Sequence, residues 1–325
     1  MPVIDGDDAL AVAAQRLADG GLVAFPTETV YGLGARADDD AAVARIFAAK
    51  GRPADHPLIV HVAHAEAAAH FADSLSPAAQ RLMASFWPGP LTLIVPRRPG
   101  VAAAAAGGQG SIGLRLPAHP LAQALLTAAA RLGVPGVAAP SANRFGRISP
   151  TTAAHVVQEF GPDLMVLDGG SCPVGIESAI VDCTRAQPAL LRPGQLSRLQ
   201  IEAVLGQALA APDAASPRAS GTLASHYAPA APVRLWHRAA LQQRLQAPML
   251  AGKVVAVYSR LIPTGSPGWI HRVMPETAAA TAHELFSVMR DLDQAGVAAI
   301  WVESPPPDAE WDGVRDRLER AAASR

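Results

Sequence analysis

The sequence predicts an α/β protein with two domains, and three observations indicate this. Short apolar runs typical of buried strands alternate along the chain with segments that have the apolar spacing of helices. The length of 325 residues is sufficient for two domains. Between residues 207 and 231 the composition changes to mainly alanine, proline, serine and glycine, which is typical of a linker. We therefore expect a larger N-terminal domain over residues 1–206 and a smaller one over residues 232–325.

In the N-terminal part, each helix and strand is predicted from the spacing of its apolar residues. Helical periodicity predicts helices over residues 9–18, 40–49, 64–72, 77–86, 119–131 and 197–206. Apolar runs bounded by proline, glycine or polar residues predict strands over residues 21–26, 57–62, 91–95, 112–116, 137–139, 164–168, 177–183 and 188–191. Ser149, followed by Pro150 and Thr151, is typical of an N-cap with proline at the first helical position, so we expect a further helix that reaches about residue 160.

After the linker, the alternation of strands and helices resumes. Strands are predicted over residues 232–236, 253–258 and 297–302, and helices over residues 238–246, 279–294 and 309–323. Because a helix that connects two strands usually places them parallel, this pattern predicts a small, mostly parallel α/β domain.

Composition and charge argue against several functional classes. Half of the residues are hydrophobic and 17% are charged, which is enough apolar material for a folded core. The formal net charge is −1, whereas a protein that chiefly grips nucleic acid usually has a basic excess. No uninterrupted apolar run reaches the ~18 residues of a membrane span, and the acidic first residues lack a signal-peptide pattern. We therefore expect a cytoplasmic protein that does not bind membranes.

Cysteine, histidine and glycine patterns argue against common cofactors. Cys172 and Cys183 fit no metal-binding spacing and no HExxH motif is present, so we expect two buried thiols and no zinc site. The GxGxxG/A pattern over residues 32–37 begins six residues after Pro26, where the predicted strand ends, and the pattern over residues 108–113 precedes a strand instead of a helix. Neither suits a nicotinamide or flavin site, and no P-loop motif occurs.

Two cations lie at the end of a predicted helix. Only two of the 27 basic residues are lysines, and one of these, Lys50, is followed by Gly51 and Arg52. A compact ammonium beside a forked guanidinium suits a triphosphate, although cations at the C-terminus of a helix also interact favourably with its dipole. Upstream, residues 25–34 place two hydroxyls and a carboxylate in a turn after a buried strand, which is either a capping loop or part of a ligand site.

Further polar side chains lie in or beside predicted strands. Arg115 is inside an apolar strand, and burying an unpaired guanidinium costs on the order of several kcal/mol, so a carboxylate of the chain or a ligand anion must pair with it. Hydroxyl and amide groups follow a short strand at residues 139–143, Ser178 begins a later strand, and Arg192 ends the next one. Because α/β domains keep their ligand sites at the ends of strands, these residues are candidates for one site.

Eight short motifs, taken in this order, resemble the YrdC-type threonylcarbamoyl-AMP synthases. They are PTETVYGLG (26–34), KGRP (50–53), PLIVH (57–61), WPGPLT (87–92), GLRLP (113–117), APSAN (139–143), SPT (149–151) and LRPG (191–194). The resemblance covers about residues 9–205, and SHYAP (225–229), followed by a small α/β domain, resembles the longer two-domain form of the family. Each motif alone is weakly specific, whereas eight in the family's order are highly specific.

The resemblance implies a twisted-sheet N-terminal domain with a positively lined concavity, and a smaller Rossmann-like α/β domain after the linker. It also implies that L-threonine, bicarbonate and ATP are converted to L-threonylcarbamoyl-AMP and pyrophosphate, with Mg²⁺ accompanying the ATP. Transferase proteins would then pass the threonylcarbamoyl group to an adenosine beside the anticodon of tRNA. This chemistry depends on positioning and charge neutralisation, so we expect no Ser-His-Asp or Cys-His arrangement.

The resemblance also implies roles for individual residues. Those implied to hold L-threonine are Thr29, His61, Arg115, Ser178 and the backbone around Ala139. Those implied to contact ATP are Lys50, Arg52, His56, Ser111, Ser141, Asn143, Ser149, Arg192 and Tyr227. Lys50, Arg52 and Arg115 are expected to act on the reacting groups, and no protein ligand for a metal is assigned. Many relatives have asparagine where this chain has His56, which introduces a titratable group.

Three other functions are alternatives at the level of the sequence. The first is an RNA-binding module of the same fold without synthase activity; the net charge and the aromatic content of 5% disfavour it, so tRNA binding should be weak at most. The second is a carbamoyl-transfer module that matures metal centres, which the lack of paired zinc-type cysteines and of an acylphosphatase-like segment disfavours. The third is an inactive paralogue, which the intact KGR and SAN motifs disfavour.

The linker is expected to close over the active site. A flexible stretch of about 20 residues reaches far across a domain, at up to ~3.3–3.6 Å per residue. Tyr227, beside His226 in a segment rich in alanine and proline, is a candidate for contact with the nucleotide; the alternative is that it packs on its own domain. Closure would keep water away from the labile adenylate.

Overall fold

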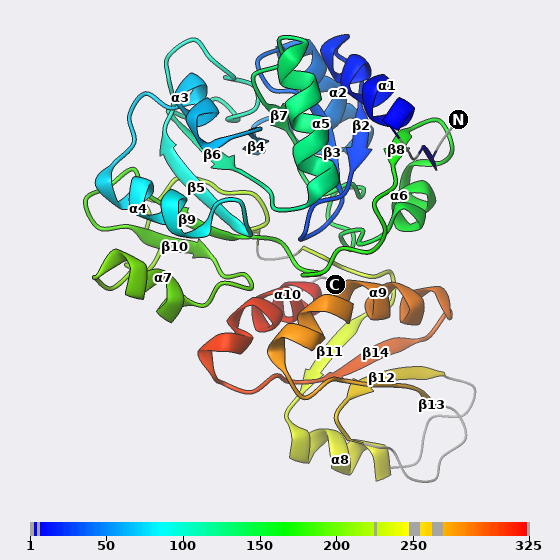
Figure 1. Ribbon diagram of the computed structural model, residues 1–325. Helices are drawn as coiled ribbons and strands as arrows, with labels where there is room; N and C mark the ends of the chain where they lie inside the picture. Colours follow the sequence, from blue (N-terminus) through cyan, green and yellow to red (C-terminus); the bar gives the residue numbers. More distant parts are fainter. Residues whose placement is uncertain (1–2, 5–6, 224–225, 247–253, 262–268, 324–325) are drawn as a thin grey trace.

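Two sheets with helices packed on them make up the fold (Figure 1). The computed structural model describes residues 3–4, 7–223, 226–246, 254–261 and 269–323. The first sheet is mixed and has ten strands, in the order β1-β8-β2-β3-β7-β4-β6-β5-β9-β10. The second has four parallel strands, in the order β11-β14-β12-β13. The α/β fold class with a second, smaller α/β domain, predicted from the sequence, is confirmed.

The first sheet is covered by helices on both faces. Its strands are β1 (Val3–Ile4), β2 (Val23–Phe25), β3 (Gly32–Arg36), β4 (Ile59–His61), β5 (Leu91–Pro96), β6 (Ser111–Arg115), β7 (Val137–Ala138), β8 (Met165–Leu167), β9 (Ala179–Asp182) and β10 (Ala189–Arg192). The helices are α1 (Asp7–Ala18), α2 (Asp40–Lys50), η1 (Ala65–Ala67), α3 (Ala68–Phe71), α4 (Pro77–Phe86), α5 (Pro120–Arg131), α6 (Ala153–Phe160) and α7 (Arg198–Leu205). Apolar residues of α1 and α5 share one core cluster, and those of α2, α4 and α7 share another. Burial of these two clusters is the main favourable contribution to the stability of the domain.

The ends of α2 are determined by local sequence, and they place two cations at the site. The Asp39 carboxylate accepts hydrogen bonds from the backbone N–H groups of Ala41 and Ala42, at 2.9 and 3.1 Å, and so caps the first turn. Gly51 ends the helix with a φ of 63°, a left-handed conformation that glycine adopts without strain. Lys50 is therefore the last helical residue, and Arg52 begins the loop that leads to β4.

The glycine-rich residues 32–36 form strand β3, which the apolar pattern did not predict. This strand lies antiparallel between β2 and β7. A Cβ at Gly34 would lie 2.7 Å from the Phe25 ring and 2.8 Å from the Val137 side chain, so the close approach of these side chains requires glycine there. The strands β1 and β13 were not predicted either.

The helix start predicted at Ser149 is wrong. α6 begins at Ala153, and its N-cap is Thr152, whose hydroxyl accepts a hydrogen bond from the backbone N–H of His155 at 3.3 Å. Ser149 is fully buried, and its hydroxyl donates to the carboxylate of Glu177. Leaving the buried Glu177 carboxylate without this donor would be costly, whereas Thr152 can cap the helix in place of Ser149. The hydroxyl of Ser149 therefore serves Glu177, and residues 149–152 lie outside the helix.

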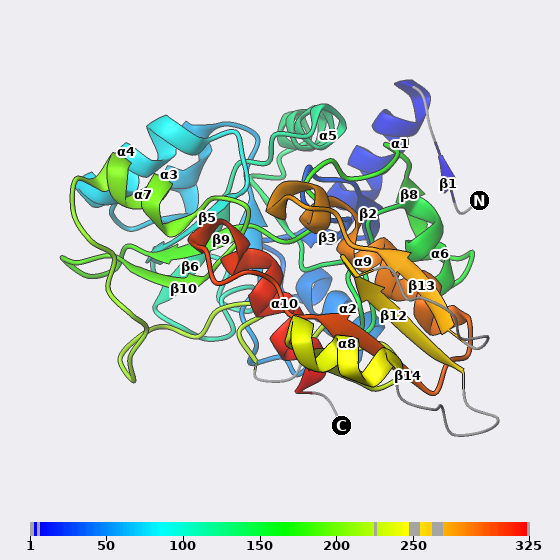
Figure 2. The same cartoon turned by 90° about the horizontal axis from the view of Figure 1, so that it is seen from below.

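The C-terminal domain presents two of its helices to the N-terminal domain (Figures 1 and 2). Its elements are β11 (Val233–Trp236), α8 (Arg238–Gln246), β12 (Val255–Ser259), β13 (Trp269–Val273), α9 (Ala278–Gln294), β14 (Ala299–Glu303), η2 (Ala309–Trp311) and α10 (Asp312–Ala322). α9 and α10 lie between the small sheet and the N-terminal domain, and α8 lies on the opposite face of the small sheet. Residue 253, the first of a predicted strand, lies outside the described residues.

The segment between the two sheets runs along the N-terminal domain. The backbone of Ala210 pairs with the start of β10, through hydrogen bonds of 3.3 Å with Leu190 and 2.8 Å with Pro188. Further on, Arg218 forms an ion pair of 2.8 Å with Asp55, and Ala228 donates to the Gly146 carbonyl at 2.9 Å. These contacts hold the segment against the N-terminal domain on both sides of residues 220 and 221.

Three sequence-based expectations about cofactors and membranes can be compared with the fold. Cys172 and Cys183 are free and buried, as predicted, and burial raises the pKa of each thiol to about 12. Among the residues described, no cluster of three or more His, Cys, Asp or Glu side chains could hold a metal ion. Within the same ranges, no helix combines the length and the apolar character that crossing a membrane requires.

Candidate active site

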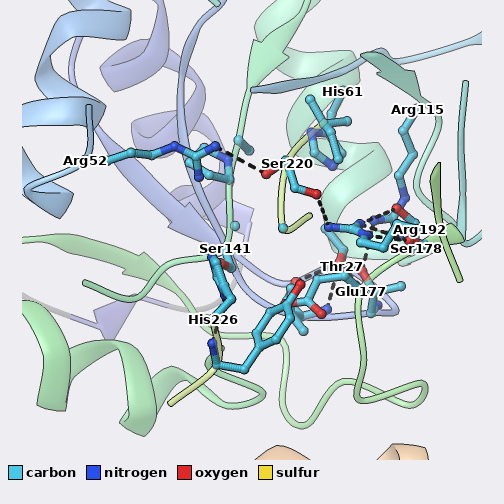
Figure 3. A pocket seen from close by; sticks show the side chains of 18 residues that line it. Thr27, Arg52, His61, Arg115, Ser141, Glu177, Ser178, Arg192, Ser220 and His226 are labelled. Atoms are coloured by element: carbon cyan, nitrogen blue, oxygen red, sulfur yellow. Dashed lines mark hydrogen bonds between the residues drawn. The ribbon is translucent and has the colours of Figure 1, made fainter. Parts of the chain in front are cut away.

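A narrow cavity lies where the strand ends of the N-terminal domain meet the linker (Figure 3). Its volume is about 40 Å³. It is lined by Thr27, Thr29, Val30, Gly32, Arg52, Ile59, His61, Arg115, Ala139, Pro140, Ser141, Glu177, Ser178, Arg192, Ser220, Gly221, His226 and Tyr227. Nine residues singled out from the sequence are among them: Thr29, Arg52, His61, Arg115, Ala139, Ser141, Ser178, Arg192 and Tyr227.

Arg115 pairs with a carboxylate of the chain itself. Its Nη2 lies 2.7 Å from Oε1 of Glu28, and both side chains are more than nine-tenths buried. Its Nη1 donates to the hydroxyl of Thr29 at 2.9 Å. The turn after β2 thus supplies both contacts, which is the protein-carboxylate alternative left open by the sequence.

His61 lies beside Arg115 because β4 and β6 are paired in that register. Burial, and secondarily the positive charge of Arg115, lower the pKa of this imidazole to about 3. Among the described residues, no hydrogen-bond partner is found for its Nδ1. His61 is therefore neutral near pH 7 and has a ring nitrogen available to a ligand.

Ser178 and Arg192 form a second polar cluster in the cavity. The Ser178 hydroxyl lies 2.8 Å from that of Thr92. Arg192 donates to the Ser178 carbonyl at 2.9 and 3.1 Å and to the Ser220 carbonyl at 2.8 Å. All of these acceptors are neutral, so the charge of Arg192 is not balanced by its hydrogen-bond partners.

Lys50 and Arg52 are buried cations on the other side of the cavity. The ammonium of Lys50 lies in the wall, not at the surface of the cavity, and donates to the carbonyls of Ser141, at 2.6 Å, and Asn143. Burial, reinforced by the charge of Arg52, lowers the pKa of Lys50 well below its usual value. Arg52 donates to the Pro57 carbonyl at 3.0 Å, and burial lowers its pKa to about 10.

These cations share one electrostatic property. Over the ranges that the structure describes, Lys50, Arg52 and Arg192 form no ion pair with a carboxylate. Burial without an anionic partner disfavours the charged form of each of these groups, and a polyanionic ligand would stabilise it.

Glu177 is a cavity residue to which the sequence analysis assigned no role in ligand binding. One of its oxygens accepts the hydroxyl of Ser149, and the other accepts Nε of Arg317 at 2.9 Å. Arg317 belongs to α10 of the C-terminal domain. Burial raises the pKa of the Glu177 carboxyl, but the charges of Arg317 and Arg192 and the bond from Ser149 outweigh it, and the net shift is downward. In the sequence, the role of Glu177 is indicated only by the position of a carboxylate next to Ser178 in an apolar stretch.

The linker forms one wall of the cavity through Ser220, Gly221, His226 and Tyr227. Tyr227 is 2% exposed, and its ring stacks on Phe286 of α9, with 5.4 Å between ring centroids. No partner for its hydroxyl is found within the described residues, and burial raises its pKa to about 12. Gly221 lies so close that a Cβ there would be 2.5 Å from the Tyr227 hydroxyl. Tyr227 therefore both lines the cavity and packs on the C-terminal domain.

The remaining residues predicted from the sequence lie outside the cavity lining. They are Lys50, His56, Ser111, Asn143 and Ser149. Asn143 donates to the carbonyls of Arg144 and Arg147, at 2.8 and 2.9 Å, and so shapes the loop that Lys50 also holds. The ring of His56 lies 5.4 Å from that of Phe145, and Ser111 lines a smaller neighbouring cavity. In this conformation these side chains lie behind or beside the residues that line the cavity.

Comparisons with known proteins agree over the whole chain. A family model described as "Telomere recombination" matches residues 15–194, and one described as "Threonylcarbamoyl-AMP synthase, C-terminal domain" matches residues 196–323. The threonylcarbamoyl-AMP synthase of Pyrococcus abyssi is 38% identical to this chain, and the alignment covers 97% of this chain and 94% of the relative. That of Bacillus subtilis is 37% identical, with 98% and 94% covered. The crystal structure of P. abyssi Sua5 complexed with L-threonine has a TM-score of 0.87 to this chain at 36% identity, covering 99% of this chain and 97% of the other.

Proposed function

The chain belongs to the Sua5-type family of two-domain threonylcarbamoyl-AMP synthases, and we propose that the cavity between its strand ends and its linker is the site of this reaction. The observation that carries the proposal is the set of three buried cations without carboxylate partners among the described residues, Lys50, Arg52 and Arg192, around one cavity. ATP is the substrate whose triphosphate would balance these charges.

ATP is assigned to the side of the cavity formed by the loop after α2 and the linker. Arg52 and Ser141 lie on its surface, and Arg192, beside Ser178, reaches the same side through its hydrogen bond to the Ser220 carbonyl of the linker. Lys50 lies behind this surface and holds the carbonyls of residues 141 and 143 by hydrogen bonds. It either keeps this role when ATP binds or turns its ammonium toward the phosphates. His56, Ser111, Asn143, Ser149 and Tyr227 complete the set of residues that we assign to the nucleotide.

L-Threonine is assigned to the opposite side, where Arg115 lies. A relative with 36% identity is known in complex with L-threonine. Arg115 would bind the carboxylate of the amino acid, with Thr29, Ser178, His61 and the backbone at Ala139 around it. Because Glu28 already forms an ion pair with Arg115, the substrate carboxylate would share this guanidinium with a protein carboxylate.

The reaction needs positioned reactants more than a protein nucleophile. The amine of threonine and bicarbonate form a carbamate with loss of one water molecule. An oxygen of the carbamate then attacks the α-phosphorus of ATP, and pyrophosphate leaves. The enzyme contributes orientation of the carbamate and neutralisation of the charge on the phosphates. Lys50, Arg52 and Arg115 are the residues that we place closest to the reacting groups.

Mg²⁺ is assigned to the nucleotide and not to a site made by protein ligands alone. Glu177 lines the cavity, Glu28 lies between the lining residues Thr27 and Thr29, and each of the two carboxylates is paired with an arginine. Mg²⁺ is commonly held mainly by substrate phosphates and water, so these residues are compatible with a Mg²⁺–ATP complex. When bound, the ion would add positive charge at the phosphates.

The linker acts as a lid in this proposal, between an N-terminal domain of residues 1–206 and a C-terminal domain of residues 232–325. Ligand pockets usually measure about 300–1,000 Å³, whereas this cavity has about 40 Å³. The linker must therefore move outward before ATP enters, and its return would exclude water from the adenylate.

The product is consumed elsewhere. We propose that other proteins use threonylcarbamoyl-AMP to transfer the threonylcarbamoyl group to tRNA. This chain itself would bind tRNA weakly at most. The two free thiols suit a reducing compartment, and we place the reaction in the cytoplasm on that ground.

Pyrophosphate release is the direct test. The protein is incubated with ATP, Mg²⁺, L-threonine and bicarbonate, and each of the last two is omitted in turn. Release should require both, and mass spectrometry should find threonylcarbamoyl-AMP. Release that is independent of threonine would contradict the assignment.

A further inference from the structure

One arginine of the C-terminal domain reaches the wall of the cavity. Arg317, on α10, is 1% exposed; it donates to Asp316 of its own helix at 2.9 Å and to three neighbouring groups of the N-terminal domain. Nε donates to the Glu177 carboxylate at 2.9 Å, Nη2 to the Glu177 carbonyl at 3.0 Å, and Nη1 to the Pro193 carbonyl at 2.7 Å. One planar guanidinium thus holds both Glu177, which precedes Ser178, and Pro193, which follows Arg192.

The same guanidinium also contacts the linker. Its central carbon lies 5.4 Å from the centre of the Tyr227 ring, which also contacts the rings of His226 and Phe286. The close approach of α10 depends on Gly313, because a Cβ there would lie 2.6 Å from the Gly194 carbonyl oxygen. α10 is therefore packed against the cavity wall at two successive turns.

Glu177 contributes a negative charge to the lining of the cavity. It interacts electrostatically with Arg192. Both of its oxygens are occupied, one by Ser149 and one by Arg317. Arg192 has no carboxylate partner among the described residues, so without Arg317 the buried Glu177 carboxylate would be attracted toward Arg192.

We propose that Arg317 is a positioning residue for ATP binding: it holds the Glu177 carboxylate away from Arg192, so that the charge of Arg192 is available to the triphosphate. The C-terminal domain thereby completes the electrostatics of a site formed by the N-terminal domain. This inference rests on the proposed assignment of ATP to the cavity. Arg317 touches neither the substrate nor the reacting atoms, so its effect is on affinity for ATP.

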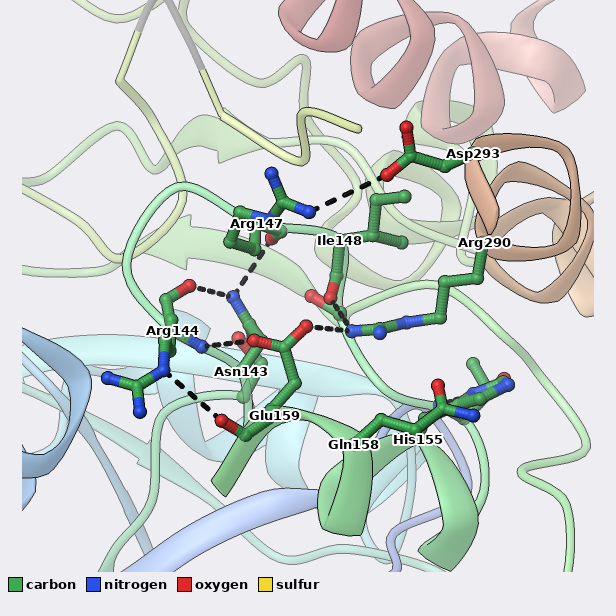
Figure 4. Close-up of polar contacts among 12 residues, drawn as sticks. Asn143, Arg144, Arg147, Ile148, His155, Gln158, Glu159, Arg290 and Asp293 are labelled. Carbon is green, nitrogen blue, oxygen red and sulfur yellow. Dashed lines mark hydrogen bonds and ion pairs between the residues drawn. The ribbon is translucent and has the colours of Figure 1, made fainter. Parts of the chain in front are cut away.

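A second arginine at the same interface provides a matched control (Figure 4). Arg290 of α9 pairs with Glu159 at 2.9 Å and donates to the Ile148 carbonyl. Like Arg317, Arg290 is buried and joins the two domains. Neither Arg290 nor Glu159 lines the cavity. If Arg317 only held the domains together, loss of either arginine would have the same consequences.

The decisive comparison is between Arg317→Met, Arg290→Met and the double variant Arg317→Met/Glu177→Gln. Calorimetry with a non-hydrolysable ATP analogue and Mg²⁺ measures nucleotide affinity, and thermal unfolding measures stability. We expect Arg317→Met to weaken nucleotide binding about tenfold or more, since a hydrogen bond to a charged group is worth ~1.5–3 kcal/mol. Arg290→Met should lower the melting temperature and leave nucleotide affinity within about twofold of the parent protein.

The double variant separates positioning from a general structural defect. A neutral glutamine does not compete for Arg192, so nucleotide affinity should recover to within about threefold of the parent value. Unchanged affinity in Arg317→Met, equal weakening in Arg290→Met, or no recovery in the double variant would each overturn the inference. Failure of the parent protein to bind the analogue would instead overturn the assignment of ATP to this cavity.

Two milder substitutions serve if Arg317→Met does not fold. Arg317→Lys retains a charge near Glu177 but cannot bond Glu177 and Pro193 together, so nucleotide affinity should fall by less than in Arg317→Met. Gly313→Ala pushes α10 away from Gly194 and should weaken nucleotide binding without removing any charge. If both folded variants bind the analogue as the parent does, the inference is wrong.

Discussion

Arg115 and Glu28 form a buried ion pair, with 2.7 Å between Nη2 and Oε1, at the point where the turn after β2 meets the end of β6. The pair answers the question of how a guanidinium is accommodated inside an apolar strand. Arg115 therefore has a carboxylate partner, whereas Lys50, Arg52 and Arg192 have none among the described residues. A polyanionic ligand would stabilise the cations that the protein itself leaves unpaired.

Arg115→Lys should weaken threonine binding and leave nucleotide binding intact. An ammonium can still pair with Glu28 but cannot at the same time reproduce the forked contact with a second carboxylate, so a loss of ~1.5–3 kcal/mol of threonine binding is expected. Calorimetric titration with threonine measures it. Arg36→Lys, at a partly exposed pair with Asp38, is the matched control. A variant that melts earlier but binds threonine as before would show that the pair is only structural.

Arg52→Ala and Lys50→Ala should each raise the ATP concentration needed for pyrophosphate release. Arg52 would lose a direct contact, and Lys50→Ala would release the carbonyls of Ser141 and Asn143. The expected cost is ~1.5–3 kcal/mol per variant. Arg36→Ala, at the partly exposed pair with Asp38, should change nothing. An unaltered dependence on ATP in both variants would refute the assignment.

Binding of ATP and threonine together should protect the linker from trypsin. Arg218 is half exposed and lies in the linker just before the residues that line the cavity, so opening of the linker exposes the bond that follows it. Cleavage there, followed by mass spectrometry, should slow when both ligands are present. Trypsin does not cleave after glutamine, so the fragment that is lost in Arg218→Gln is the one produced by cleavage after Arg218. Equal rates with and without ligands would contradict the role of the linker as a lid.

Acidification should destabilise the protein between about pH 6.5 and pH 3. Burial lowers the pKa of His61 and of His226 to about 3, from 6.5 in the unfolded chain. In that window the unfolded state binds more protons, so the free energy of unfolding falls as pH falls, by up to ~1.4 kcal/mol per pH unit for each histidine. Urea unfolding at a series of pH values measures the slope.

His61→Asn isolates one of these two contributions. The variant should be less stable than the parent at pH 7 but should lose less stability on acidification, because the neutral side chain does not titrate. His64→Asn, at an exposed position three residues away, should keep the slope of the parent protein. An equal slope in His61→Asn and the parent would show that His61 is not the source.

Much of this protein could be predicted from its sequence, where the determining contacts are local. The apolar spacing predicted most helices and strands, including α4 over residues 77–86 without error. Capping and turn residues, such as Asp39 and Gly51, act on the backbone within a few positions and so are readable from sequence. The order of the eight motifs identified the family, and the change in composition falls between α7, which ends at Leu205, and β11, which begins at Val233.

Only the tertiary structure decided which charges are paired. The partners Arg115 and Glu28 are 87 residues apart, and Arg317 and Glu177 are 140 apart. Apolar periodicity indicates that such a side chain is buried, but the identity of its partner depends on how strands are ordered and how α10 docks. The same reason explains the errors at Ser149, whose hydroxyl serves Glu177, and at β3, whose glycines are required by neighbouring strands. Local preference is weak, about 1 kcal/mol or less for a residue, and a buried charge or a steric clash outweighs it.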